Sequence, residues 1–153
     1  MRRSICFTEP KFVYAGQKTT LKFIYSPANN LPKGSRLKFD PLSKGREIDW
    51  EIPHTSNKSS HPMIWLETPQ GTMVPAKAIQ GKSKICPQFE FIMPHEIKAG
   101  DEVVICMGGE DHAHGCRAQL HVQRRRPFNL FIDLKGNGDY KEPEIFSLDV
   151  KGN

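Results

Sequence analysis

The amino-acid sequence predicts an all-β protein: a single β-sandwich of about eight or nine antiparallel strands, immunoglobulin-like or Greek key. Apolar and polar residues alternate with a period of two in several segments, as in strands with one buried and one solvated face. Twelve glycines and twelve prolines interrupt the chain with turns. Because the apolar spacing of an amphipathic helix is absent, we expect one β-domain over residues 1–153.

The first strands are predicted where this alternation is regular, over residues 17–25 (QKTTLKFIY) and 88–93 (QFEFIM). Residues 101–106 (DEVVIC) are more uniformly apolar, which is typical of a strand that is covered on both faces. Between them, residues 53–62 (PHTSNKSSHP) are expected to form a polar loop and to be the segment most prone to disorder. The side chains predicted to face the core are Leu21, Phe23, Tyr25, Phe89, Phe91 and Met93.

Two later segments alternate as well. Residues 116–124 (CRAQLHVQR) have the most regular pattern in the chain, and residues 144–150 (EIFSLDV) close the predicted fold. We expect one face of each of these strands to be buried and the other to meet water. The predicted core residues are Cys116, Ala118, Leu120, Val122, Phe146, Leu148 and Val150.

Composition excludes two classes of protein. With 37% hydrophobic and 25% charged residues, the chain is too apolar for a disordered polymer and too polar for a membrane protein. The start, MRRSICFTEPKF, has no apolar stretch behind its charged tip, so we expect a cytoplasmic protein or a piece of a longer one. Its four cysteines are then expected to be free thiols. The net charge of +5 permits an anionic partner without requiring one.

Residues 106–116 (CMGGEDHAHGC) combine two cysteines and two histidines at a predicted hairpin tip. Thiolate and imidazole are zinc ligands, so Cys106, His112, His114 and Cys116 form a candidate zinc site, although their spacing matches no standard zinc module. A disulfide across the two strands is a second interpretation, because flanking strands bring Cβ atoms to about 4 Å. The third, which we favour, is a hairpin with a buried Cys116 and solvated histidines.

Residues 133–144 (DLKGNGDYKEPE) resemble a calcium-binding loop, with oxygen ligands and a glycine at the sharp turn. Lys135 stands where a carboxylate is expected, and strands replace the usual flanking helices. A simple turn around the two glycines is therefore the alternative. The candidate calcium ligands are Asp133, Asn137, Asp139 and Glu144.

The arginine run Arg124, Arg125 and Arg126 is a candidate anion-binding site, because guanidinium groups bind phosphate through two hydrogen bonds. In a regular strand Arg125 would face away from the other two, so nucleic-acid binding is not expected. Trp50 and Trp65 could form a sugar-binding platform, but buried sandwich tryptophans are commoner. No arrangement of catalytic residues is recognisable, and we expect no enzyme activity from this chain.

Several short motifs follow in a characteristic order: VYAGQKTTLKFIY, LPKGSRLKFD, IKAGDEVVICMGG, CRAQLHVQRRRPFNLFIDLKGNGDYKEPE and SLDVKG. This order resembles the N-terminal β-sandwich of a bacterial family catalogued as domain of unknown function 3604, over residues 10–152. Full-length members of that family resemble metal-dependent phosphoesterases, whose metal ligands lie in a C-terminal domain that nothing here matches. The resemblance implies an accessory or separated sandwich, and it transfers no catalytic residue.

We therefore predict a non-catalytic accessory or binding module without a resident cofactor. It would dock to a protein partner, or to the enzyme domain that is missing here, and would not associate with membranes. The alternative is a stand-alone protein that binds zinc or calcium through one of the two candidate loops.

Overall fold

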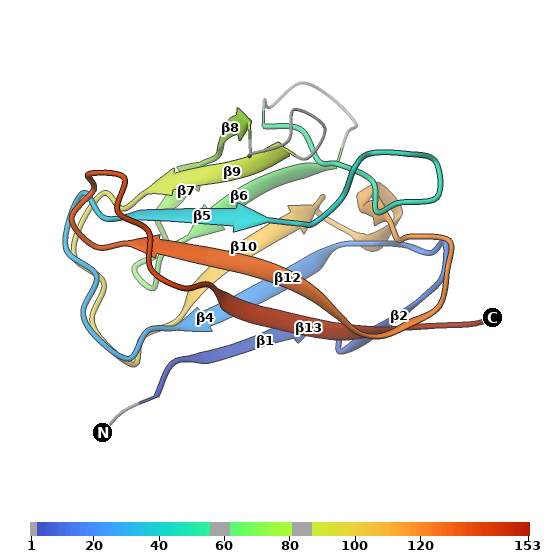
Figure 1. Ribbon diagram of the computed structural model, residues 1–153, viewed down its shortest axis with the longest axis horizontal. Coiled ribbons are helices and arrows are strands. Elements are labelled where there is room, and N and C mark those ends of the chain that lie inside the picture. Colours follow the sequence, from blue (N-terminus) through green and yellow to red (C-terminus); the bar gives the residue numbers. More distant parts are fainter. Residues whose placement is uncertain (1–2, 56–61, 81–86) are drawn as a thin grey trace.

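The computed structural model describes residues 3–55, 62–80 and 87–153 (Figure 1). Within these residues the chain forms thirteen strands and one short 3-10 helix, η1 (His112–His114). Two sheets pack face to face, which confirms the all-β sandwich (Figure 1). The expected eight or nine strands become thirteen because several pieces contain only two to four residues. No helix of the described chain is long and apolar enough to cross a membrane.

The first sheet has five strands, all antiparallel to their neighbours. Its spatial order differs from the chain order, so strands from the two halves of the chain pair with one another at its centre. In spatial order the strands are β1 (Ile5–Glu9), β4 (Leu21–Ser26), β10 (Val103–Gly108), β6 (Met63–Glu67) and β7 (Met73–Pro75).

The second sheet has six strands, of which β13 and β2 pair in parallel, so the expectation of a purely antiparallel fold is wrong at one edge. A two-stranded ribbon of β11 (Cys116–Arg117) and β3 (Lys18–Thr19) closes one end. The six strands are, in spatial order, β2 (Phe12–Tyr14), β13 (Glu144–Lys151), β12 (Gln123–Asp133), β5 (Arg36–Asp40), β9 (Pro87–Ile92) and β8 (Lys77–Gln80).

The core lies between the two sheets and contains most of the residues that the alternation predicts. The ring of Phe23 in β4 lies 4.7 Å from that of Phe39 and 4.8 Å from that of Phe128, centroid to centroid. Each fully buried side chain of this size contributes about 1.5–3 kcal/mol to the stability of the fold. Burial is confirmed for Leu21, Phe23, Tyr25, Phe89, Phe91, Met93, Cys116, Ala118, Phe146, Leu148 and Val150.

The predicted strand over residues 116–124 is wrong for residues 118–122, whereas Gln123 and Arg124 begin β12. Leu120 is 51% exposed and Val122 is 59% exposed. Instead of pairing with a strand, the segment bonds to loops: its Leu120 N–H donates to the carbonyl of Ile48 over 3.0 Å. The chain bends there, and the amide of Gln119 occupies the buried position. Alternation alone does not form a strand when no neighbouring strand is available to pair with it.

Strand β10 was predicted to be covered on both faces. Its Val103, Ile105 and Met107 side chains lie in the core, as expected. Val104 and Cys106 lie on the opposite, outer face of the five-stranded sheet, where Val104 is only half-buried. The prediction therefore holds for the inner face and for Cys106, which is 2% exposed on the outer face, and holds only partly for Val104. Of the predicted polar loop over 53–62, residues 56–61 lie outside the described residues.

Candidate functional site

The glycine-rich hairpin between β10 and β11 packs closely against Thr19 and Thr20. A Cβ atom on Gly115 would lie 2.1 Å from the carbonyl carbon of Thr19, and one on Gly108 would lie 2.4 Å from Oγ1 of Thr20. The Thr20 hydroxyl donates to the Asp111 carbonyl over 2.8 Å and accepts from the Gly109 N–H over 2.9 Å. The glycines of this loop are therefore explained by the close approach of two backbones.

The two histidines of the hairpin have different partners. Nδ1 of His112 accepts the backbone N–H of Thr20 over 3.1 Å and lies 3.0 Å from the Thr19 hydroxyl. Nδ1 of His114 lies 2.6 Å from Oδ1 of Asp111, on the exposed side of the loop. This hydrogen bond is the main reason that the pKa of Asp111 is lowered. Both rings are thus engaged in holding the loop.

The two cysteines of the hairpin point to different parts of the molecule. Cys106 pairs with Lys22 and Trp65 on the outer face of the five-stranded sheet, whereas Cys116 pairs with Thr19 and lies in the core. Both are free thiols, so the disulfide interpretation is wrong. Burial raises the pKa of Cys106 to about 12 and also raises that of Cys116, which keeps both thiols protonated at neutral pH.

The structure therefore does not assemble the predicted zinc ligands around one point. Within the described residues, no three His, Cys, Asp or Glu side chains are grouped so that they could hold a metal ion. The favoured interpretation of the hairpin, a buried Cys116 with exposed histidines, agrees with this geometry.

The calcium-like loop is a turn that is held by hydrogen bonds to the carboxylate of Asp133, which is fully buried. Its Oδ1 accepts the Gly136 N–H over 3.0 Å, and its Oδ2 accepts the Gly138 N–H over 2.7 Å. Both glycines have positive φ, of 68° and 91°, as such a turn requires. Oδ1 of Asn137 accepts the Asp139 N–H over 3.1 Å. The carboxylate that would begin a calcium loop is thus already hydrogen bonded to the backbone.

The arginine run is split by a β-bulge between Gln123 and Arg126, where Arg125 adopts a positive φ of 51°. The bulge shifts the phase of the strand, so Arg126 turns inward and is 4% exposed. Arg124 and Arg125 remain exposed. The prediction of three arginines available to an anion is therefore wrong for Arg126.

The Arg126 guanidinium is held by neutral groups. Its Nε donates to Oε1 of Gln119 over 3.1 Å, its Nη2 donates to the Leu42 carbonyl over 3.1 Å, and it lies 4.2 Å from the ring centroid of Phe128. Burial lowers the pKa of Arg126 to about 10, against the opposing effect of two nearby aspartates. Trp50 packs beside the same Phe128 and is fully buried, which removes it from any sugar platform.

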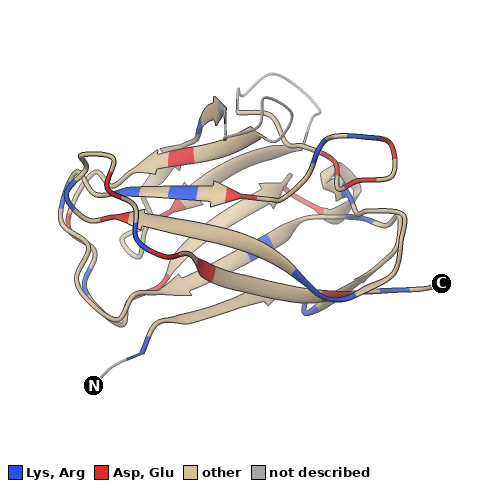
Figure 2. Cartoon of the chain, viewed as in Figure 1, with Lys and Arg blue, Asp and Glu red and all other residues tan. Residues whose placement is uncertain are grey.

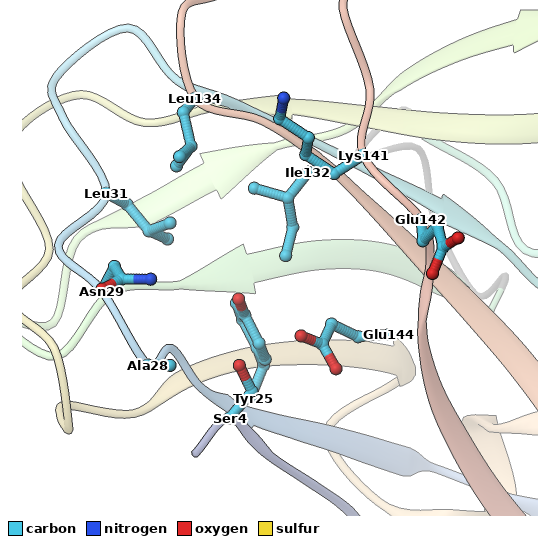
Figure 3. A pocket seen from close by; sticks show the side chains of 10 residues that line it. All are labelled: Ser4, Tyr25, Ala28, Asn29, Leu31, Ile132, Leu134, Lys141, Glu142 and Glu144. Carbon is cyan, nitrogen blue, oxygen red and sulfur yellow. The ribbon is translucent and has the colours of Figure 1, made fainter. Parts of the chain in front are cut away.

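A pocket of about 160 Å³ opens where the β12–β13 hairpin faces the start of β1 and the end of β4 (Figure 3). No local motif indicates this pocket, although Glu144, the first residue of β13, is one of the candidate calcium ligands. Tyr25, the last core-facing residue of β4, lies opposite Glu144 in the pocket. The lining residues are Ser4, Tyr25, Ala28, Asn29, Leu31, Ile132, Leu134, Lys141, Glu142 and Glu144.

The carboxylate of Glu144 determines the electrostatics of this pocket. Burial raises the pKa of Tyr25, and the negative charge of Glu144 raises it further, while a hydrogen bond with Ser4 opposes the shift. Burial and the same carboxylate raise the pKa of Cys6 to about 12. Glu144 is half-buried and has no ion-pair partner within the described part of the chain.

Comparison with known proteins finds relatives of unknown function. The whole chain is 46% identical to an uncharacterised protein of Chlamydia muridarum, 43% identical to one of Chlamydia pneumoniae and 44% identical to one of Chlamydia trachomatis serovar D. The chain spans about a quarter of the length of each (25–26%). No protein-family model and no solved structure matches the chain, so the resemblance to domain of unknown function 3604 stays a prediction.

Proposed function

We propose that the chain is a non-catalytic β-sandwich module of a longer polypeptide, and that the outer face of its five-stranded sheet packs against another part of that polypeptide. The observation that carries this proposal is the apolar character of that face. In an antiparallel sandwich the outer face of a sheet is normally polar, because it meets water.

The strand register defines this face. Phe7 pairs with Ile24, Ile24 with Val104, and, one pair further along, Cys106 with Trp65. Side chains that are paired in this way lie on the same side of the sheet. Along each strand these residues alternate with core residues, which point to the other side of the sheet. We call the outward set the apolar face, and it comprises Phe7, Ile24, Trp65, Pro75, Val104 and Cys106.

Two charged side chains lie within this face, because Lys22 pairs with Cys106 and Glu67 pairs with Val104, and further exposed apolar side chains lie at its edges. Lys22 pairs with Glu9, and Glu67 accepts the indole N–H of Trp65 over 3.1 Å. At the sheet edges Ile5 is 55% exposed and Met73 is 64% exposed. Apolar side chains that are grouped on one outer sheet face mark a site of contact with another protein or domain.

The relatives indicate what covers this face. Each of them continues for three quarters of its length outside the segment that this chain matches. The resemblance to domain of unknown function 3604 supports the same arrangement, because the sandwich of that family accompanies a domain that resembles a phosphoesterase. The covering element in our proposal is therefore a neighbouring domain of the same polypeptide.

Binding in trans tests the proposal. The part of the Chlamydia muridarum relative outside the matched segment is purified, its folded state is checked by circular dichroism, and it is titrated with the chain in a calorimeter. We expect saturable binding that Val104→Lys weakens at least about tenfold, the equivalent of 1.4 kcal/mol. Ser147→Lys, an exposed strand residue of the other sheet, is the matched control and should leave binding unchanged.

Absence of binding to the folded remainder would contradict the proposal. So would equal weakening by Val104→Lys and Ser147→Lys, because the contact would then not involve the apolar face.

A further inference from the structure

From the geometry of the pocket between β4 and the β12–β13 hairpin, we propose that it binds an alkylammonium group, with the carboxylate of Glu144 as its counter-ion. This site is separate from the apolar face, because Tyr25 and Glu144 point toward the space between the sheets. The proposal for this pocket is therefore independent of the proposed docking through the apolar face.

The charge that points into the pocket is negative. Figure 3 shows the carboxylate of Glu144 directed toward the phenol of Tyr25, whereas the amine of Lys141 and the carboxylate of Glu142 point away from the pocket centre. This carboxylate is half-buried and has no ion-pair partner among the described residues, so it has lost part of its hydration without gaining an opposite charge there. An ammonium group would supply charge-assisted hydrogen bonds to it.

The rest of the lining suits an alkyl chain. Leu31, Ile132 and Leu134 extend toward the pocket from one side, opposite Tyr25 and Glu144 (Figure 3). The volume of about 160 Å³ is below the range of roughly 300–1,000 Å³ that is typical of sites for larger ligands. The pocket therefore fits a short aliphatic amine better than a nucleotide or a cofactor.

The same chemistry has two sources, a free aliphatic amine and the side chain of a lysine in a protein partner. In both, three or four methylene groups would lie against the leucines and isoleucine, while the ammonium group reaches the carboxylate. The apolar lining is thus common to both sources, and only the group at the far end of the alkyl chain distinguishes them.

Amide chemical-shift titration of ¹⁵N-labelled protein tests this site with two probes, n-butylammonium and Nα-acetyl-lysine N-methylamide. We expect saturable shifts at Ser4, Tyr25 and Glu144 with a dissociation constant on the order of 1 mM. The neutral analogues, 1-butanol and Nα-acetyl-norleucine N-methylamide, should bind at least about tenfold more weakly, because they lack the positive charge.

Three variants locate the interaction. Glu144→Gln should weaken binding of the cationic probe at least about tenfold, whereas Glu142→Gln removes a carboxylate of the same loop that points away and should change it less than about twofold. Ala28→Leu fills the pocket without altering its charge and should weaken binding of both probe types. It keeps the proposal testable if Glu144→Gln disturbs the fold.

Saturation by n-butylammonium alone would assign the site to free amines, and saturation by the lysine amide alone would assign it to a partner's lysine; both results support the proposal. It is overturned if neither probe saturates, if the neutral analogues bind equally well, or if Glu144→Gln binds the amine as the wild type does. None of these results bears on the apolar face.

Discussion

The outer faces of the two sheets differ in chemistry. On the six-stranded sheet, Arg36, Lys38 and Glu90 lie on adjacent strands, and the charged residues of β5 and β9 are visible in Figure 2. The loop of the β12–β13 hairpin covers part of this face: the hydroxyl of Tyr140 donates to Glu90 over 3.0 Å, and the Lys38 ammonium lies 4.1 Å from the centroid of the Tyr140 ring. The corresponding face of the five-stranded sheet has Ile24 and Val104 at its centre.

The six-stranded sheet satisfies part of its outer charge with its own loop, although it also exposes apolar side chains at Phe12, Ile92 and Ile145. On the five-stranded sheet Ile24 and Cys106 are buried, while Phe7, Trp65 and Val104 are half-buried. The sheets therefore differ at their centres, where one has charges that contact its own loop and the other has apolar side chains. Four substitutions test this contrast, in order of decreasing effect.

The largest effect is expected at Asp133, whose carboxylate holds the loop of the β12–β13 hairpin. Asp133→Ala removes the acceptor of two backbone N–H groups at a fully buried position, and we expect it to lower the free energy of unfolding by about 2–3 kcal/mol. Urea denaturation measures this loss. Asp139→Ala, in the same loop but exposed, should change stability by less than about 0.5 kcal/mol. Equal effects of the two substitutions would show that the hydrogen bonds of Asp133 do not hold the loop.

The second prediction concerns pH and the thiol of the apolar face. The folded pKa of Cys106 is raised to about 12, so between its ordinary value near 9 and 12 the folded state keeps a proton that the unfolded state has released. The stability that this thiol contributes is therefore fully present below pH 9 and is lost as the pH rises toward 12. Between pH 8 and pH 10, the free energy of unfolding of Cys106→Ala should fall by about 1 kcal/mol less than that of the wild type. Urea denaturation at the two pH values measures it. Parallel losses would mean that this thiol is not buried.

Tyr140→Phe should have an effect of similar size. It removes the hydrogen bond to Glu90 and leaves the ring over Lys38, so we expect the free energy of unfolding to fall by about 1 kcal/mol. Thermal or urea denaturation measures it against Tyr14→Phe, which alters an exposed ring in β2 and should be neutral. No loss in Tyr140→Phe would indicate that the loop does not rest on the sheet through its hydroxyl.

The smallest effect is expected at the edge of the apolar face. Met73→Ser, at a side chain that is 64% exposed in the edge strand β7, should change the stability of the isolated chain by less than about 0.5 kcal/mol. Urea denaturation at two protein concentrations provides the measurement. A loss above about 1 kcal/mol that depends on concentration would mean that copies of the chain cover this face for one another.

The strands that the sequence predicted correctly share one property. In the segments that became β4, β9 and β13, alternation coincides with a neighbouring strand on at least one side, so the local pattern and the tertiary pairing agree. Residues 116–124 alternate just as regularly, but residues 118–122 meet loops. A pattern of side chains does not reveal which backbone will be adjacent to it.

The candidate sites show the same limit. The sequence identified Glu144 as a calcium ligand, and the structure instead places its carboxylate against Tyr25, 119 positions away in the chain, in a pocket that no local motif indicates. The three arginines were recognised as charged, but the bulge that buries Arg126 depends on its packing with Gln119 and Phe128. The glycines of the hairpin near Cys106 became understandable only with Thr20 beside them.

Period-two patterning and composition thus predicted the all-β class and most of the core residues. The tertiary structure was needed to show which sheet has a loop over its outer face, which carboxylate has no ion-pair partner among the described residues, and which arginine is buried. These properties depend on strand order and on contacts between residues far apart in the chain, and local periodicity contains no information about either.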